Sequence, residues 1–146
     1  MCIRDRDRYP WLIKEKLFIK NWVLMLEKPF FGICLGHQLL GDALGASVKK
    51  SKNPEIGFKQ ISLSPKVCSN NLLSNLSSDM LVLQGHSAEI SDLSNNEVTV
   101  LASSGDCSIQ ALAFSNHAFS VQFHPCLLYT SPSPRDATLS RMPSSA

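Results

Sequence analysis

The sequence has no uninterrupted apolar run that approaches the length of a membrane span, so we expect no membrane partner. It has no Cys-x-x-Cys pair, and its five cysteines are widely spaced. That pattern argues against a zinc site and against a disulfide framework, and it favours a reducing compartment, the cytoplasm. No internal repeat is present. The chain of 146 residues is 44% hydrophobic, which suits one globular domain with its own core.

The two ends of the chain differ from the middle. Residues 1–5 with two bases of Arg6 can be encoded by ATGTGTATAAGAGACAG, and the last base of Pro125 through Thr130 by the reverse complement, CTGTCTCTTATACACAT. These strings look like the transposase-end adapter of a sequencing library. We therefore expect residues 1–6 and 126–146 to be artefactual extensions, the second disordered, and residues 7–125 to be a partial domain. The alternative is that the Ser/Pro-rich end is a natural disordered tail.

The adapter interpretation also changes the charge. The formal net charge of +2 comes from the two ends, so residues 7–125 carry no net charge. The basic pI of the full chain therefore gives no indication of a nucleic-acid partner, and we expect none.

Residues 28–38 predict a nucleophile on a sharp turn. Apolar residues lead into Gly32, Cys34 follows, and Gly36 opens a segment with helical spacing of leucines. Two glycines beside a nucleophile remove side chains where a strand and a helix press together, so the nucleophile stands in a strained, exposed conformation. A helix N-terminus favours the Cys34 thiolate, and the Leu35 N–H becomes an oxyanion donor. The alternative for Cys34 is a buried core residue.

Two motifs resemble those of a known family. Residues 32–38, Gly-Ile-Cys-Leu-Gly-His-Gln, closely resemble the nucleophile motif of class I glutamine amidotransferases. Residues 121–125, Val-Gln-Phe-His-Pro, resemble the segment that carries the catalytic His of that family. Residues 9–12 and 54–57 also look like the free-standing members similar to the amidotransferase part of GMP synthase. The resemblance covers roughly residues 7–125, and its two motifs lie in the family's order.

The expected fold is α/β. The resemblance implies a flavodoxin-like three-layer α/β/α sandwich whose N-terminal strands are missing, which would leave the strand at residues 30–34 with an unpaired edge. Residue patterns predict helices at 11–26 and 38–44 and a loop with a short helical turn at 68–79. The predicted strands begin at 48 and span 57–63, 80–83, 98–102, 109–114 and 118–123.

The resemblance assigns roles to individual residues. Cys34 is the expected nucleophile, and His124 the imidazole that protonates the leaving ammonia and activates water. Leu35 supplies an oxyanion N–H, and Gln38 helps to hold the substrate glutamine. The segment 84–87, with His86 and Ser87, loosely matches a turn that recognises the amino acid end of the substrate.

Two other histidines receive no catalytic role. We expect His37 to be structural, although it adjoins the turn, and His117 to be a solvated turn residue. The alternative for His124 is a structural residue at a strand end whose ring is hydrogen-bonded within the fold. The alternative for Gln38 is an ordinary exposed helix residue without a role.

Two parts of the family's site are missing from the chain. The acid of the triad normally follows the His by two residues, where Cys126 stands here, and the natural gene is expected to encode Glu there. A Gly-Gly loop that supplies the other oxyanion N–H would precede Asp7. We therefore expect this chain itself to have negligible activity.

The implied function is hydrolysis of the glutamine side-chain amide through a Cys34 thioester, giving glutamate and ammonia. No metal or cofactor is needed, and the expected partners are glutamine and an ammonia-accepting synthetase or amine substrate. Two alternatives stay open. One is a γ-glutamyl peptide hydrolase of the same fold, and the other is a non-catalytic regulatory paralogue.

Overall fold

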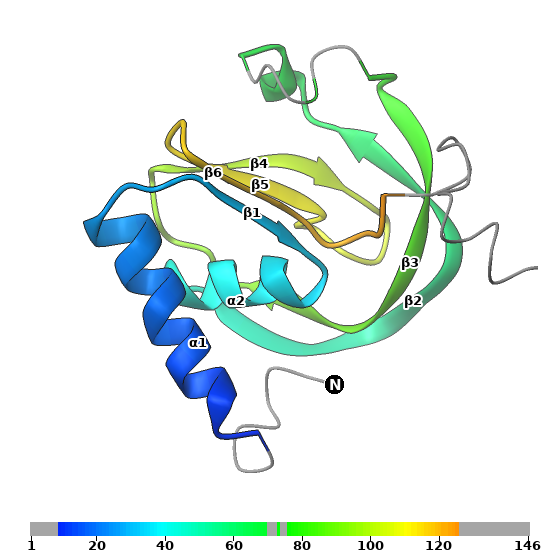
Figure 1. Ribbon diagram of the computed structural model, residues 1–146. Helices are drawn as coiled ribbons and strands as arrows, with labels where there is room; N and C mark the ends of the chain where they lie inside the picture. Colours follow the sequence, from blue (N-terminus) through cyan, green and yellow to red (C-terminus); the bar gives the residue numbers. More distant parts are fainter. Residues whose placement is uncertain (1–8, 70–72, 74–75, 126–146) are drawn as a thin grey trace, which may run out of the picture.

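The computed structural model describes residues 9–69, 73 and 76–125, so the expected artefactual ends lie outside the described residues. The described residues form a six-stranded sheet with two α-helices beside it (Figure 1). The helices are α1 (Trp11–Lys20) and α2 (Leu35–Ala43), with a π-helical turn η1 (Asn21–Met25) and a 3-10 helix η2 (Pro65–Ser69). The strands are β1 (Phe30–Ile33), β2 (Ser47–Leu63), β3 (Asp79–Ser91), β4 (Val98–Ser103), β5 (Ala111–Phe114) and β6 (Ala118–Val121).

The sheet order places the two sequence motifs side by side. The order is β1-β6-β5-β4-β2-β3, and β1 pairs with β6 in parallel, with Ile33 opposite Val121. Because parallel strands end at the same edge of a sheet, the residues that follow β1 and β6 meet there. That pairing brings Cys34 next to residues 122–124, although the chain between them is long. The other strand pairs are antiparallel.

The core is divided between the two faces of the sheet. Along β5, Leu112 and Phe114 pack with both α-helices, whereas Ala111 and Ala113 pack on the opposite face. This alternation follows from the two-residue period of a strand. Val67 of η2 adds to the second face. The predicted α/β fold of the flavodoxin-like class is confirmed, with the antiparallel extension formed by β2 to β5.

Most predicted elements are present with shifted bounds. The helix expected at 11–26 is α1 followed by the π-helical turn, and α2 starts earlier than expected, at Leu35. Gly45, with φ 93°, ends α2 in the left-handed region that glycine favours. β1 is an edge strand of the described sheet, with Phe31 and Ile33 exposed. In the described parts of the chain, no helix is long and apolar enough to cross a membrane.

Two sequence predictions are wrong in the β2–β3 hairpin. The strands expected to begin at 48 and 57 are one strand, with an irregular register between Lys50 and Glu55. The turn expected at 84–87 lies within β3, where Ile56 to Lys59 of β2 pair with Gly85 to Val82. Tertiary pairing overrides the local turn signal of glycine and serine here. Figure 1 shows β2 and β3 as two long curved ribbons that run beside each other.

Candidate active site

The backbone at Cys34 forms the predicted sharp turn. β1 ends at Ile33, Cys34 takes φ 51° and ψ −98°, and α2 begins at Leu35. The Cys34 N–H donates to Val121 O at 2.9 Å, and the Gln38 N–H donates to Cys34 O at 3.2 Å. A non-glycine residue at positive φ is strained, and such strain persists only where neighbouring hydrogen bonds hold it. These two bonds tie the turn to the end of β6 and to the first helical turn.

The two flanking glycines are not equivalent. A Cβ on Gly32 would lie 2.7 Å from both the carbonyl carbon and oxygen of Gly36, a distance that real side chains do not reach. A Cβ on Gly36 would meet no atom within 4 Å. Only Gly32 is therefore required by close packing, and the expectation that both glycines remove a clash is half right.

The environment of the Cys34 thiol differs from the expected one. The thiol is half-buried, and burial raises its pKa, while hydrogen bonds from the Leu35 N–H and the Gln122 amide act in the opposite direction. The expectation that the helix N-terminus favours the Cys34 thiolate is thus wrong, because desolvation by burial outweighs the hydrogen bonds that lower the pKa. The Leu35 N–H contacts the sulfur, and its role as an oxyanion donor stays a prediction.

His124 lies on the same edge of the sheet as Cys34. Its backbone N–H donates to Leu83 O at 2.9 Å, which anchors it to β3, and its side chain is partly exposed. Its Nε2 lies 3.9 Å from the position that a Cβ on Gly85 would occupy. Among the described residues, no hydrogen bond joins His124 and Cys34. Hydrogen bonds of catalytic groups are often long before substrate binds, so this geometry leaves His124 a candidate.

Gln38 is buried and already committed to protein acceptors. Its Nε2 donates to Ala88 O at 3.0 Å and to Gln122 Oε1 at 3.2 Å. Its role in holding substrate stays a prediction. Gln122, which the sequence reasoning did not single out, is fully buried, and its Nε2 donates to Cys34 Sγ at 3.7 Å. Gln122 directly precedes Phe123 and His124 in the second motif, and this position was the sequence signal that could have identified it.

The segment expected to recognise substrate divides between the two faces of β3. His86 is buried, with Nε2 at 3.0 Å from Glu55 Oε2 and Nδ1 at 3.1 Å from Ala88 O. Ser87 is exposed on the other face, as are Leu83 and Gly85. His86 therefore contributes to the interior, and the open face beside His124 is formed by Gly85 and Ser87.

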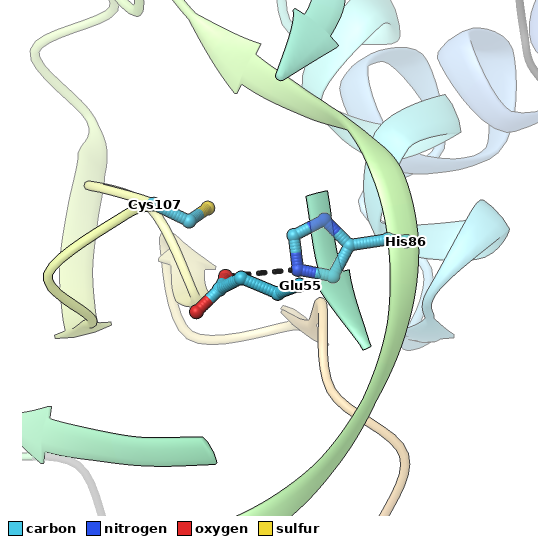
Figure 2. Close-up of side chains that lie close together, drawn as sticks. All are labelled: Glu55, His86 and Cys107. Atoms are coloured by element: carbon cyan, nitrogen blue, oxygen red, sulfur yellow. Dashed lines mark hydrogen bonds and ion pairs between the residues drawn. The ribbon is translucent and has the colours of Figure 1, made fainter. Parts of the chain in front are cut away.

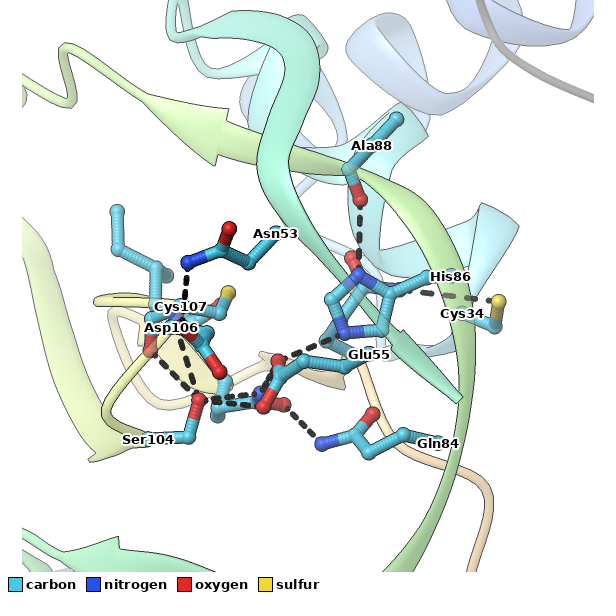
Figure 3. Close-up of polar contacts among 12 residues, drawn as sticks. Cys34, Asn53, Glu55, Gln84, His86, Ala88, Ser104, Asp106 and Cys107 are labelled. Carbon is cyan, nitrogen blue, oxygen red and sulfur yellow. Dashed lines mark hydrogen bonds and ion pairs between the residues drawn. The ribbon is translucent and has the colours of Figure 1, made fainter. Parts of the chain in front are cut away.

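Glu55 is the centre of a buried polar network that the sequence reasoning missed. Its Oε2 accepts from His86 and, at 2.6 Å, from Gln110 Nε2, and its Oε1 accepts from Ser104 at 2.8 Å. Gln84 donates to Gln110 Oε1 at 2.9 Å. Figure 3 shows these side chains converging from β2, β3 and the segment before β5. The alternation along β3, which turns Gln84 and His86 inward, was the sequence signal.

Cys107 joins Glu55 and His86 in a group with metal-ligand chemistry (Figure 2). One ligand atom from each lies within 4.8 Å of the others, and all three residues are buried. Both Glu55 oxygens, however, already accept protein hydrogen bonds, and burial raises the pKa of the Cys107 thiol to about 12. Glu55 and His86 thus belong to a hydrogen-bonded network, and the Cys107 thiol beside them donates to Ile109 O at 3.5 Å.

His37 is structural, as predicted. It is fully buried; its Nδ1 accepts from Ser120 Oγ at 2.8 Å and its Nε2 donates to Ile109 O at 3.1 Å. Burial lowers its pKa to about 4, so the ring is neutral and fixes α2 to the sheet.

His117 lies in the predicted turn but is half-buried, and its Nε2 donates to Val23 O at 3.0 Å. A cavity of about 440 Å³ beside it, at the start of β1, includes neither Cys34 nor His124.

Comparison with known proteins identifies relatives of the chain. A family model described as glutamine amidotransferase class-I matches residues 6–136. One subunit of the glutamine-hydrolysing GMP synthase of Saccharolobus solfataricus is 37% identical over 115 residues, which cover 78% of this chain and 57% of the relative. The corresponding protein of Sulfolobus acidocaldarius is 33% identical over 114 residues, covering 77% and 58%.

The solved structures agree with these relatives. The crystal structure of a glutamine amidotransferase from Thermotoga maritima matches with a TM-score of 0.74 at 30% identity, covering 85% of this chain and 51% of that one. The chain thus spans a little more than half the length of these three proteins. With the family model covering most of the sequence and both motifs at one edge of the sheet, the chain belongs to the class I glutamine amidotransferases.

Proposed function

We propose that the chain carries the nucleophile half of a site that hydrolyses the side-chain amide of glutamine to glutamate and ammonia. The observation that supports this most is Cys34 at φ 51° on the turn between β1 and α2, at the edge where β6 delivers residues 122–124. A strained residue held by the surrounding fold is a common feature of active sites. The relatives whose names describe them as glutamine-hydrolysing support the choice of substrate.

The first half of the reaction forms a thioester. Because burial raises the pKa of Cys34, the thiol loses its proton during the attack, and His124 is the base that takes it. Sulfur adds to the amide carbon, and the Leu35 N–H stabilises the oxyanion. His124 then returns the proton to the amide nitrogen as the C–N bond breaks. Ammonia leaves, and the γ-glutamyl group stays on Cys34.

The second half releases glutamate. Water attacks the thioester carbon, His124 accepts a proton from that water, and the C–S bond breaks to return the thiol. To serve both halves, the His124 imidazole has to reach the sulfur when substrate binds. Its side chain is partly exposed, and among the described residues its backbone N–H is bonded to Leu83 O, which leaves the imidazole room to move.

The ammonia is a product that another enzyme uses. The relatives are each named as one subunit of a GMP synthase, which indicates a further subunit in those proteins. By that likeness we propose that an ammonia-accepting synthetase is the partner of the full protein. Glutamine is the small-molecule substrate.

Covalent labelling tests the nucleophile without requiring complete turnover. The full chain is treated with 6-diazo-5-oxo-L-norleucine, a glutamine analogue that alkylates a thiol positioned to attack the amide carbon. Mass spectrometry should find the label on Cys34, and L-glutamine but not D-glutamine should protect it. Cys107 serves as the internal control, because its pKa of about 12 keeps it a thiol.

The result is decisive in either direction. Selective, glutamine-protected labelling of Cys34 supports the proposal. Equal labelling of Cys34 and Cys107, or labelling that glutamine leaves unchanged, contradicts it. Cys68 is scored in the same experiment, although its side chain lies outside the described residues.

A further inference from the structure

We infer that Gln122 is a further catalytic residue, whose amide N–H stabilises the Cys34 thiolate, and that Gln38 is a positioning residue that orients this amide. The inference rests on the proposed function, in which Cys34 is the nucleophile. The inference concerns how the Cys34 thiolate is stabilised and not how the substrate is bound. The hydrogen bond from Gln122 Nε2 to Cys34 Sγ, 3.7 Å long, is the starting observation.

The orientation of the Gln122 amide is fixed by a chain of hydrogen bonds. The far end of the chain is the backbone carbonyl of Ala88, which can only accept, so the Gln38 atom at 3.0 Å from it must be the nitrogen. The same Nε2 is 3.2 Å from the Gln122 amide, so the Gln122 atom facing it must be the oxygen. The remaining nitrogen of Gln122 then faces the sulfur. Neither of these two amides can flip without losing a bond.

Direction matters because the two ends of an amide act oppositely on a thiolate. A donor N–H stabilises negative charge on sulfur, whereas a carbonyl oxygen at the same place repels it. With Gln38 absent, the Gln122 amide is free to turn and to accept from the thiol S–H. Gln38 therefore acts on Cys34 only through Gln122.

Burial makes this contact effective. Gln122 is fully buried and Gln38 is 4% exposed, so water does not compete for either amide. Burial also raises the pKa of Cys34, and the Gln122 amide is one of the groups that oppose this rise. A hydrogen bond to a charged acceptor in such surroundings is stronger than one between neutral groups.

The segment that carries Gln122 contacts the nucleophile at two points. Val121 O accepts the Cys34 N–H at 2.9 Å, and Gln122 donates to the sulfur of the same residue. His124 follows two residues later. One short segment after β6 thus holds the backbone of the nucleophile, contacts its sulfur and supplies the imidazole.

The test measures the ionisation of Cys34 directly. The full chain is alkylated with iodoacetamide over a range of pH, and the rate at Cys34 is followed by mass spectrometry of its peptide. Iodoacetamide is small and neutral, so a role of Gln38 in holding glutamine does not affect the rate. Gln122→Met should raise the midpoint of the curve of alkylation rate against pH by about one pH unit. Below that midpoint, the fraction of Cys34 present as thiolate should be about tenfold lower.

Two further variants separate the roles. Gln38→Met should shift the midpoint in the same direction by less, and should have no added effect in the Gln122→Met background, because it acts through Gln122. Gln110→Met is the matched control. It removes another fully buried amide, one that contacts Glu55 and Ser104 instead of Cys34, and should leave the midpoint unchanged.

An unchanged midpoint in folded Gln122→Met overturns the inference. If circular dichroism shows that Gln122→Met does not fold, Gln38→Met decides, and a wild-type midpoint in that variant overturns the orienting role and the stabilisation together. Failure of the proposed function is distinguishable, because it appears as absent or unprotected labelling of the wild-type chain by the glutamine analogue. The iodoacetamide midpoint does not depend on that result.

Discussion

The chain holds two polar clusters beside the same sheet, and they are built in opposite ways. Around Glu55, both carboxylate oxygens accept hydrogen bonds, with distances from 2.6 to 3.0 Å, and the residue lies in β2, where pairing with β3 resumes after the irregular register. Around Cys34, the backbone is strained, the thiol is half-buried, and the contact from Gln122 is 3.7 Å long. Both clusters contain a cysteine, a histidine nearby and buried glutamines, so composition does not distinguish them.

The difference indicates which cluster is suited to reaction. In the Glu55 cluster both carboxylate oxygens already accept hydrogen bonds, and breaking these buried bonds is costly, so the cluster serves to hold β2, β3 and β5 in register. A strained residue with an incomplete set of contacts has room to gain bonds when substrate arrives. The two clusters are linked through Ala88, whose carbonyl accepts from both His86 and Gln38, and through the Gln122 N–H, which donates to Gln110 O at 2.8 Å.

The largest effect should come from breaking the hydrogen-bonded network around Glu55. Glu55→Leu leaves His86, Gln110 and Ser104 without their acceptor in the interior, and should lower the free energy of unfolding by about 3–5 kcal/mol. Urea denaturation followed by circular dichroism measures this change. Exposed Glu97→Leu is the control and should change stability by no more than about 0.5 kcal/mol.

A double variant sharpens this prediction. Replacing both partners, Glu55→Leu with His86→Leu, removes the unpaired group and should cost less than the sum of the single changes. Additive costs would mean that the two residues do not act as a pair, and the description of a coupled network would then be wrong.

The next effect depends on pH and concerns His37, which fixes α2 to the sheet. Its pKa falls from 6.5 to about 4 on folding, so between these values the unfolded chain binds a proton that the folded chain excludes. Stability should therefore decrease as the pH falls from 7 to 4, by up to about 3 kcal/mol from this residue. Below pH 4 both states are protonated and the loss stops.

The variant His37→Gln isolates this contribution. It lacks the titrating ring, while Glu55 and His86 are common to both proteins, so the difference between the two pH profiles reports His37 alone. Unfolding in urea at several pH values should show the steeper decline in the wild type. Parallel profiles would contradict the burial of a neutral His37.

Local sequence patterns predicted the elements that are short and contiguous. Gly32, Cys34 and the leucines after them specify strand, turn and helix within a few residues, and Gly45 marks the helix end. These signals act over neighbouring residues, where backbone sterics decide the conformation. The resemblance to the family supplied His124, since nothing in residues 121–125 alone indicates that they lie beside Cys34.

The parts that could not be predicted depend on pairing across the sheet. The glycine and serine of segment 84–87 indicated a turn, but pairing with β2 keeps the segment extended, and the resulting register turns His86 inward to Glu55. The contact from Gln122 to Cys34 likewise requires the parallel pairing of β1 with β6. The pKa of Cys34 was expected to fall at the helix N-terminus, whereas burial, which sequence does not reveal, raises it.

The smallest effect tests the strain that sets the Cys34 cluster apart. At φ 51° a glycine avoids the clash that a Cβ suffers, so Cys34→Gly should be more stable than Cys34→Ala by about 1 kcal/mol, although both lack the sulfur. In an ordinary helix the order is reversed, and Ala43→Gly in α2 should lower stability by about 1 kcal/mol. Urea denaturation of the variants and the wild type gives the comparison. Cys34→Gly and Cys34→Ala should both lose all labelling by the glutamine analogue, so the difference in stability between them reports the backbone strain alone. A glycine variant less stable than the alanine variant would mean that the turn is relaxed, and the contrast between the two clusters would then rest on hydrogen bonding alone.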